Sequence, residues 1–294
     1  MNRTRIQIAK PDILAFFSEE MPPILRERQI ASALAQQRKG WRLAQSTTLT
    51  AFIEFLLKSG RLKRHKFDFP NRPETVYTWG TPATMELLLH LKANSYFSHY
   101  TALRMHGLTE QVPKLVYISH ERSTPSSTGD DITQAAIDKA FRQPARVSQN
   151  AVDFGELRIV LLNSANTGEL GVVDQEHQQG EGHAAKVRVT SIERTLIDAA
   201  VRPTYCGDVA EVAKAFELAR GKFSVNALGA MLSKMGFTYP YHQAIGFYLE
   251  RAGYRDGVVD IIRRFPMKHD FYLTHDMADT RYESAWRLHV PKSF

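Results

Sequence analysis

Residues 46–67 read STTLTAFIEFLLKSGRLKRHKF, and this stretch determines the fold expected for the amino-terminal part of the chain. Its apolar side chains recur at helical spacing and form one stripe, made of Leu49, Phe52, Ile53, Leu56 and Leu57. The run Ser46-Thr47-Thr48 supplies an N-cap before the stripe, and Gly60 supplies a C-terminal stop. The sequence therefore predicts a short amphipathic helix that begins on hydroxyl side chains.

A basic β-hairpin is predicted directly after this helix. The β-prone runs 61–67 and 75–79 are separated by Asn and Pro turn residues at 70–73. Two further helical patterns, at 12–20 and 25–37, come before residue 46. Three helices followed by a basic hairpin is the element order of a winged helix-turn-helix, which we predict for residues 1–80.

The excess positive charge of the chain lies entirely in this segment. Residues 1–80 hold 14 Lys and Arg against 7 Asp and Glu, whereas residues 81–294 hold 24 of each, so the net +7 belongs to the first part. Charge concentrated in a small segment favours a polyanionic partner such as nucleic acid. The alternative is a protein-interaction module whose basic hairpin is a solvated sheet edge.

We expect the helix that starts near Thr48 to act as a recognition helix. Its first turn would bring short hydroxyl side chains close to base edges, and the flanking basic residues would contact phosphates. The predicted DNA-binding residues are Arg42, Ser46, Thr47, Thr48, Thr50, Lys58, Arg61, Lys63, Arg64 and Lys66.

The remainder, residues 81–294, is predicted to be a second domain of mixed α/β structure that becomes helical from about residue 191. Strands are expected at 115–119, 157–162 and 186–190, and exposed loops at 121–131 and 163–183. The whole chain is therefore expected to be an α+β protein of two domains.

Motifs for catalysis or cofactor binding are missing from the sequence. It has no G-x-x-x-x-G-K-[ST] run and no G-x-S-x-G elbow, and 180–185 matches G-x-G-x-x-A without the required strand before it. A single cysteine, Cys206, excludes a multi-cysteine metal site. Arg194 and Asp198 are expected to form a helical ion pair. We predict that the chain is not an enzyme and has no catalytic residues, cofactor or metal.

Three segments of the second part resemble the AbiEi family, the antitoxins of type IV toxin–antitoxin and abortive-infection systems. They are YFSHYTALRMHGLTEQVP (96–113) with the VYIS strand after it, VTSIERTLIDAAVRP (189–203) and YPYHQAIGFYLERAGY (239–254). The resemblance implies a repressor that binds operator DNA of its own operon through the amino-terminal domain. It also implies a second domain that counters a nucleotidyltransferase toxin encoded beside it.

The leading hypothesis is therefore a cytoplasmic DNA-binding repressor that is also an antitoxin. Its partners would be double-stranded operator DNA and a nucleotidyltransferase-type toxin, and no membrane, because no stretch approaches about 18 apolar residues. Two alternatives stay open: an enzyme-type antitoxin, such as an atypical kinase that modifies the toxin, and a stand-alone ligand-sensing regulator. The oligomeric state is unknown from the sequence.

Overall fold

The computed structural model describes residues 4–125, 132–178 and 184–294. Its contacts divide the chain into two compact units. The first holds the residues up to Ala93 and the segment 178–185, and the second holds Asn94–His177 and Lys186–Phe294. The sequence predicts a boundary at Gly80, whereas the contacts group residues 81–93 with the first unit.

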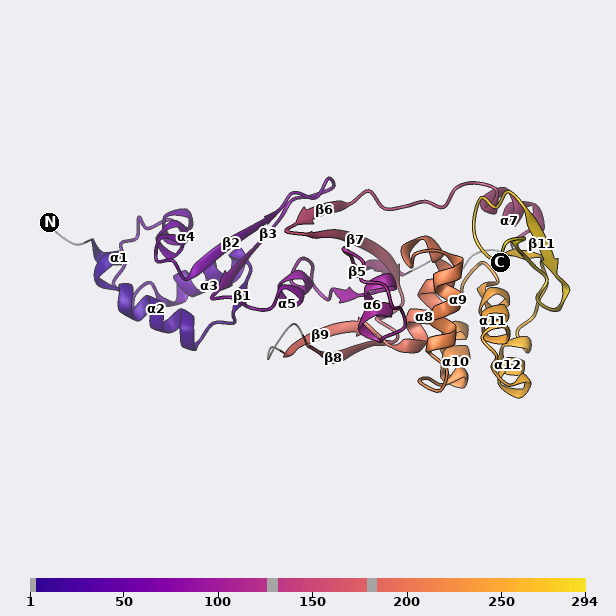
Figure 1. Ribbon diagram of the computed structural model, residues 1–294. Helices are drawn as coiled ribbons and strands as arrows, with labels where there is room; N and C mark the ends of the chain where they lie inside the picture. The colour runs from indigo at the N-terminus through magenta and orange to yellow at the C-terminus, as the bar shows by residue number, and fades with distance from the viewer. Residues whose placement is uncertain (1–3, 126–131, 179–183) are drawn as a thin grey trace. The chain divides into compact units, whose positions relative to one another are not determined.

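The first unit combines helices with one three-stranded antiparallel sheet in the order β1-β3-β2 (Figure 1). The predicted helix and hairpin after residue 46 are confirmed. The short strand β1, between Pro23 and α3, was not predicted. The elements are α1 (Arg5–Ile8), α2 (Lys10–Glu19), β1 (Ile24–Leu25), α3 (Glu27–Gln37), α4 (Leu49–Lys58), β2 (Leu62–Phe67), β3 (Glu74–Trp79) and α5 (Thr84–Leu89).

The core of this unit forms around the apolar stripe of α4. Phe52, Ile53 and Leu56 of the stripe are buried. Trp41, in the connection between α3 and α4, stacks on Phe52 with 5.7 Å between ring centroids. Burial of large aromatic side chains on one face of α4 leaves its opposite face exposed.

A half-buried carboxylate, Glu74, ties residues beyond Gly80 to the first unit. Glu74 accepts a hydrogen bond from Arg26 at 3.0 Å and another from Lys92. Arg26 also donates to the carbonyl of Leu91. Burial alone would raise the pKa of Glu74, but the hydrogen bonds from Lys92 and Arg26 outweigh burial and lower it. These contacts explain why the compact unit extends to Ala93.

The second unit begins with a six-stranded mixed sheet in the order β6-β7-β5-β4-β9-β8. Strands β5 and β7 run parallel, whereas β4 is antiparallel to β5 and parallel to β9. The elements of this half are β4 (Tyr96–Phe97), α6 (His99–Met105), β5 (Leu115–Pro125), α7 (Gln134–Phe141), β6 (Ala151–Phe154), β7 (Leu157–Asn166), β8 (Val172–Gln178) and β9 (Ala184–Thr190).

Strands occupy part of both loops predicted in this region. Strand β5 continues to Pro125 and so takes up residues 121–125 of the predicted loop at 121–131, and residues 126–131 lie outside the described residues. Within 163–183, β7 continues to Asn166 and β8 occupies Val172–Gln178. Most of the G-x-G-x-x-A match at 180–185 also lies outside the described residues.

Helices cover the next part of the chain, as predicted from residue 191. They pack in one apolar core with Phe271, Trp286 and Leu288 from the end of the chain. The helices are α8 (Ile192–Val201), η1 (Pro203–Tyr205), α9 (Val209–Leu218), α10 (Val225–Met235), α11 (Tyr241–Arg251) and α12 (Asp256–Arg263).

The prediction of a helical C-terminal part is wrong for the last residues. After α12 the chain forms a three-stranded sheet in the order β10-β12-β11, with β10 (Phe271–Tyr272), β11 (Thr280–Glu283), η2 (Ser284–Trp286) and β12 (Leu288–Pro291). Strands this short contain too few residues to display a period of two. The protein is therefore a mixed α and β structure, consistent with the α+β class.

A helix that spans a bilayer must be long and predominantly apolar. In residues 4–125, 132–178 and 184–294, no helix is both long enough and apolar enough to cross a membrane.

Candidate nucleic-acid interface

The start of α4 is held in place by hydrogen bonds from two directions. Thr48 is the N-cap, and its Oγ1 accepts from the backbone N–H of Ala51 at 3.2 Å. Arg38 donates to the carbonyl oxygens of Ala44 at 2.7 Å and Thr47 at 3.0 Å. The connection before α4 is therefore fixed, although it is longer than a simple turn between two helices.

The predicted base-reading residues differ in how available their side chains are. Ser46, Thr48 and Thr50 are exposed, whereas Thr47 is half-buried. The Thr48 hydroxyl serves the helix cap. Among the residues that the structure describes, the hydroxyls of Ser46 and Thr50 have no hydrogen-bond partner. Thr50 is thus better placed than Thr48 to present a free hydroxyl.

A carboxylate that the sequence analysis missed lies on the same face of α4. Glu54 follows Thr50 by four residues and precedes Lys58 by four, which places all three along one face. Its side chain is 47% exposed and accepts a hydrogen bond from Arg64 Nη2 of β2 at 2.8 Å. The spacing of Glu54 on the predicted helix could have revealed it, but its partner is set by the tertiary structure.

The basic side chains of β2 divide between the two faces of the hairpin. Successive side chains of a strand point to opposite faces, so Arg64 and Lys66 share the face toward α4 and Lys63 lies on the other. The guanidinium of Arg64 also lies over the Tyr77 ring, 5.7 Å from its centroid. We call Thr50, Glu54, Arg64 and Lys66 the α4–β2 surface.

His65, between Arg64 and Lys66 on β2, is engaged with the neighbouring strand. Its Nε2 lies 3.0 Å from the Thr78 hydroxyl on the neighbouring strand. Burial, and then the nearby charge of Lys63, lower the pKa of His65.

Lys58 lies at the C-terminal end of α4, and Arg61 follows three residues later, both far from the threonines at the start of the helix. Arg61 donates to the Ser18 hydroxyl at 3.1 Å, and the same oxygen accepts from Trp79 Nε1 at 3.1 Å. Lys58 is exposed in the last turn of α4. The structure therefore connects Arg61 to α2.

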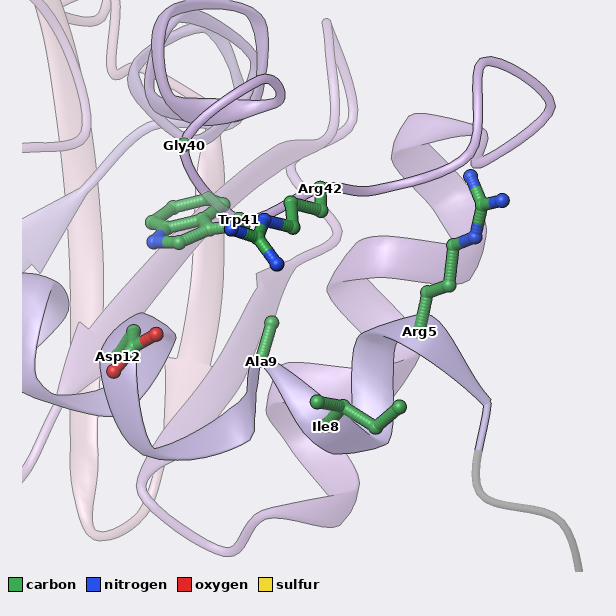
Figure 2. Close-up of a pocket in the computed structure, with 7 residues that line it drawn as sticks. All are labelled: Arg5, Ile8, Ala9, Asp12, Gly40, Trp41 and Arg42. Atoms are coloured by element: carbon green, nitrogen blue, oxygen red, sulfur yellow. The ribbon is translucent and has the colours of Figure 1, made fainter.

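Arg42 lines a separate pocket of about 630 Å³ (Figure 2). It adopts a left-handed backbone conformation, with φ of 52°, which is uncommon for a residue with a side chain. Arg5 of α1 lines the same pocket, together with Trp41 and Asp12. Two arginines from distant segments of the first unit thus meet at one hollow, a grouping that the predicted set of residues did not include.

The ion pair predicted in the second unit is confirmed. Arg194 Nε donates to the Asp198 carboxylate at 2.9 Å, one turn along α8. In the described part of the chain, no group of three or more His, Cys, Asp and Glu side chains is arranged to hold a metal ion.

Comparison with known proteins yields a structural likeness and no family. No family model and no curated protein matches the sequence. The fold is similar to the crystal structure of the RV2827C protein from Mycobacterium tuberculosis, with a TM-score of 0.58 and 13% sequence identity over 98% of this chain and 93% of that one. At this identity the likeness concerns the fold alone.

Proposed function

We propose that the first unit is a winged helix-turn-helix domain that binds double-stranded DNA, with α4 as its recognition helix and β2–β3 as its wing. The order α2, β1, α3, α4, β2, β3 with a β1-β3-β2 sheet supports this assignment. The observation that carries it is the α4–β2 surface, where an exposed helix face and basic strand residues lie side by side.

The phosphate contacts are proposed to come from Arg64 and Lys66 on the α4 side of the wing, with Lys58 and Lys63 at its margins. Such contacts release counterions, so affinity falls as salt rises. Thr50, with Ser46 and Thr47, would approach base edges from the first turn of α4.

The chain as a whole is proposed to be a repressor of its own operon and the antitoxin of a type IV-like system. The antitoxin part rests on the resemblance of residues 96–113, 189–203 and 239–254 to the AbiEi family. The charge balance of residues 81–294, with 24 basic and 24 acidic side chains, suits a surface for a protein partner better than one for nucleic acid.

Fluorescence anisotropy of the full chain on a labelled random-sequence duplex, repeated over a salt series, tests DNA binding. We expect log affinity to fall linearly with log salt. The Arg64→Gln/Lys66→Gln double variant should flatten that slope by at least about 1, mainly through the loss of Lys66, because Glu54 partly cancels the charge of Arg64. The matched control is Arg264→Gln/Lys268→Gln, two exposed basic residues of the second unit, which should match wild type. Equal loss in both double variants, or no binding by wild type, would refute the proposal.

The antitoxin part needs a separate test. A nucleotidyltransferase encoded next to this gene is co-expressed with the full chain, and growth is scored. The Arg64→Gln/Lys66→Gln variant should still restore growth if the second unit counters the toxin. Growth arrest despite soluble protein would refute this part while leaving DNA binding untouched.

A further inference from the structure

The second unit contains a pocket of about 450 Å³, lined by charged, polar and aromatic side chains, that the proposed DNA contacts do not use. Its lining comes from the later residues of β7, from the first residue of α6, from helix α8 and from the residues that follow α8. Arg122, Arg194 and Arg202 line it, together with a single carboxylate, Asp198. With these groups ionised, the lining carries two more positive than negative charges.

One of the three arginines is fully engaged within the protein. Arg194 is buried and donates to Asp198 at 2.9 Å, to the Thr167 hydroxyl at 3.1 Å and to the Leu170 carbonyl at 2.6 Å. Its charge is balanced by Asp198, so this pair forms a rigid wall of the pocket.

The surplus charge therefore resides on Arg122 and Arg202. Within the described residues, neither guanidinium has an ion-pair or hydrogen-bond partner. Arg122 is exposed and Arg202 is half-buried. Two unpaired guanidinium groups at one cavity are suited to a dianionic oxygen-rich group, because each presents a planar set of N–H donors that matches phosphate oxygens.

A strained histidine contributes a neutral polar group to the same pocket. His99 is only 8% exposed and has φ of 52°, a backbone conformation that is seldom kept without a reason. Its Nδ1 lies 2.9 Å from the Ser98 hydroxyl, which in turn lies 2.7 Å from that of Ser119. Burial lowers the pKa of His99 to about 4, so the ring is neutral near pH 7.

Aromatic side chains form another part of the lining. Tyr205 packs edge-on against His99 with 5.2 Å between ring centroids, and Phe237 also faces the pocket. A volume of about 450 Å³ falls within the range of small-molecule sites, which combine apolar walls with a few placed polar groups.

We propose that this pocket binds a nucleoside monophosphate, with Arg122 and Arg202 on the phosphate and the aromatic side chains against the base. The neutral His99 ring offers Nε2 to a hydroxyl or phosphate oxygen of the ligand. Asp198 holds Arg194 in position. A ligand at this place would contact strand β5, helix α8 and the start of α6 at once.

Isothermal titration of the full chain with AMP, GMP, CMP and UMP tests the proposal, with inorganic phosphate and the parent nucleosides as further ligands. At least one nucleotide should bind tenfold or more tightly than phosphate or its own nucleoside. Arg122→Gln and Arg202→Gln should each weaken it about tenfold, because each removes a charge-assisted contact.

The control variants separate this pocket from the proposed DNA site. Arg264→Gln, an exposed arginine of the same unit, and the Arg64→Gln/Lys66→Gln variant should bind the nucleotide as wild type does. Thermal melts of each variant check folding. No nucleotide binding, phosphate binding as tight as any nucleotide, or equal binding by Arg122→Gln and Arg202→Gln would overturn the proposal and leave the DNA-binding proposal standing.

Discussion

Arg64 of β2 donates a hydrogen bond to Glu54 of α4 at 2.8 Å, which joins the hairpin to the exposed face of the helix. The two side chains are 30% and 47% exposed. Exposed ion pairs contribute at most about 1 kcal/mol to stability, so the main consequence is electrostatic. Each residue cancels the charge that the other would present on the α4–β2 surface.

Replacing Glu54 with Gln should therefore strengthen binding to every duplex. The change removes a negative charge from the α4–β2 surface and leaves Arg64 free for a phosphate, so the salt slope should steepen by about 1. Anisotropy over a salt series measures both quantities. Glu156→Gln, which removes a more exposed, ion-paired carboxylate from the second unit, is the control. Weaker binding by Glu54→Gln would show that the carboxylate itself contacts a base.

Thr50 and Thr48 should respond differently to substitution. Thr50→Val removes a free hydroxyl and should change base preference, measured by selection from a randomised duplex pool, without lowering the melting temperature. Thr48→Ala removes the N-cap of α4 and should cost about 1 kcal/mol of stability. The reverse pattern, with Thr48→Ala as stable as wild type and Thr50→Val unchanged in preference, contradicts the assignment.

Lys66 and Lys63 should contribute unequally to DNA affinity. Lys66 shares the face of β2 that lies toward α4, and Lys63 points to the other face. We expect Lys66→Gln to weaken binding to all duplexes several-fold more than Lys63→Gln at the same salt. Both variants lose one charge, so each controls for the other. Equal losses would mean that the wing contacts phosphates with both faces.

Gly246 should be intolerant of any side chain. A Cβ added there would lie 2.1 Å from Cζ3 of Trp286, which is buried in the core of the second unit. Gly246→Ala should lower the free energy of unfolding by about 3 kcal/mol through overpacking, seen as a fall in melting temperature. Gly257→Ala in α12 meets no atom within 4 Å and should be neutral or stabilising. Similar melts for the two variants contradict the close contact.

Stability should decline as the pH falls from about 6.5 toward 4. Burial lowers the pKa of both His99 and His242 to about 4, below the ordinary value of 6.5. The unfolded chain binds these protons more readily than the folded protein does. The free energy of unfolding is therefore full above pH 6.5 and falls as the pH drops from 6.5 to 4, by up to about 3 kcal/mol for each histidine. His242→Phe should flatten the dependence of unfolding free energy on pH. A slope equal to that of wild type would contradict this.

Much of the local structure was predictable because it depends on neighbours in the chain. The stripe of α4, its Thr48 cap and the turn residues of the hairpin act over a few residues, so helix and hairpin were predicted correctly. The Arg194–Asp198 pair follows from one helical turn. Strands of two to four residues, such as β1, β11 and β12, were missed because they are shorter than the patterns that reveal strands.

The sequence by itself determined where the charge lies and which faces of the longer helices are apolar, since both are properties of residue order. Only the tertiary structure decided which charged groups meet. Glu54 and Arg64 are brought together by the packing of β2 beside α4, and strand alternation separates Lys63 from Arg64. The same holds for Arg122 and Arg202, which converge on one cavity because the sheet and α8 pack together over a long sequence separation.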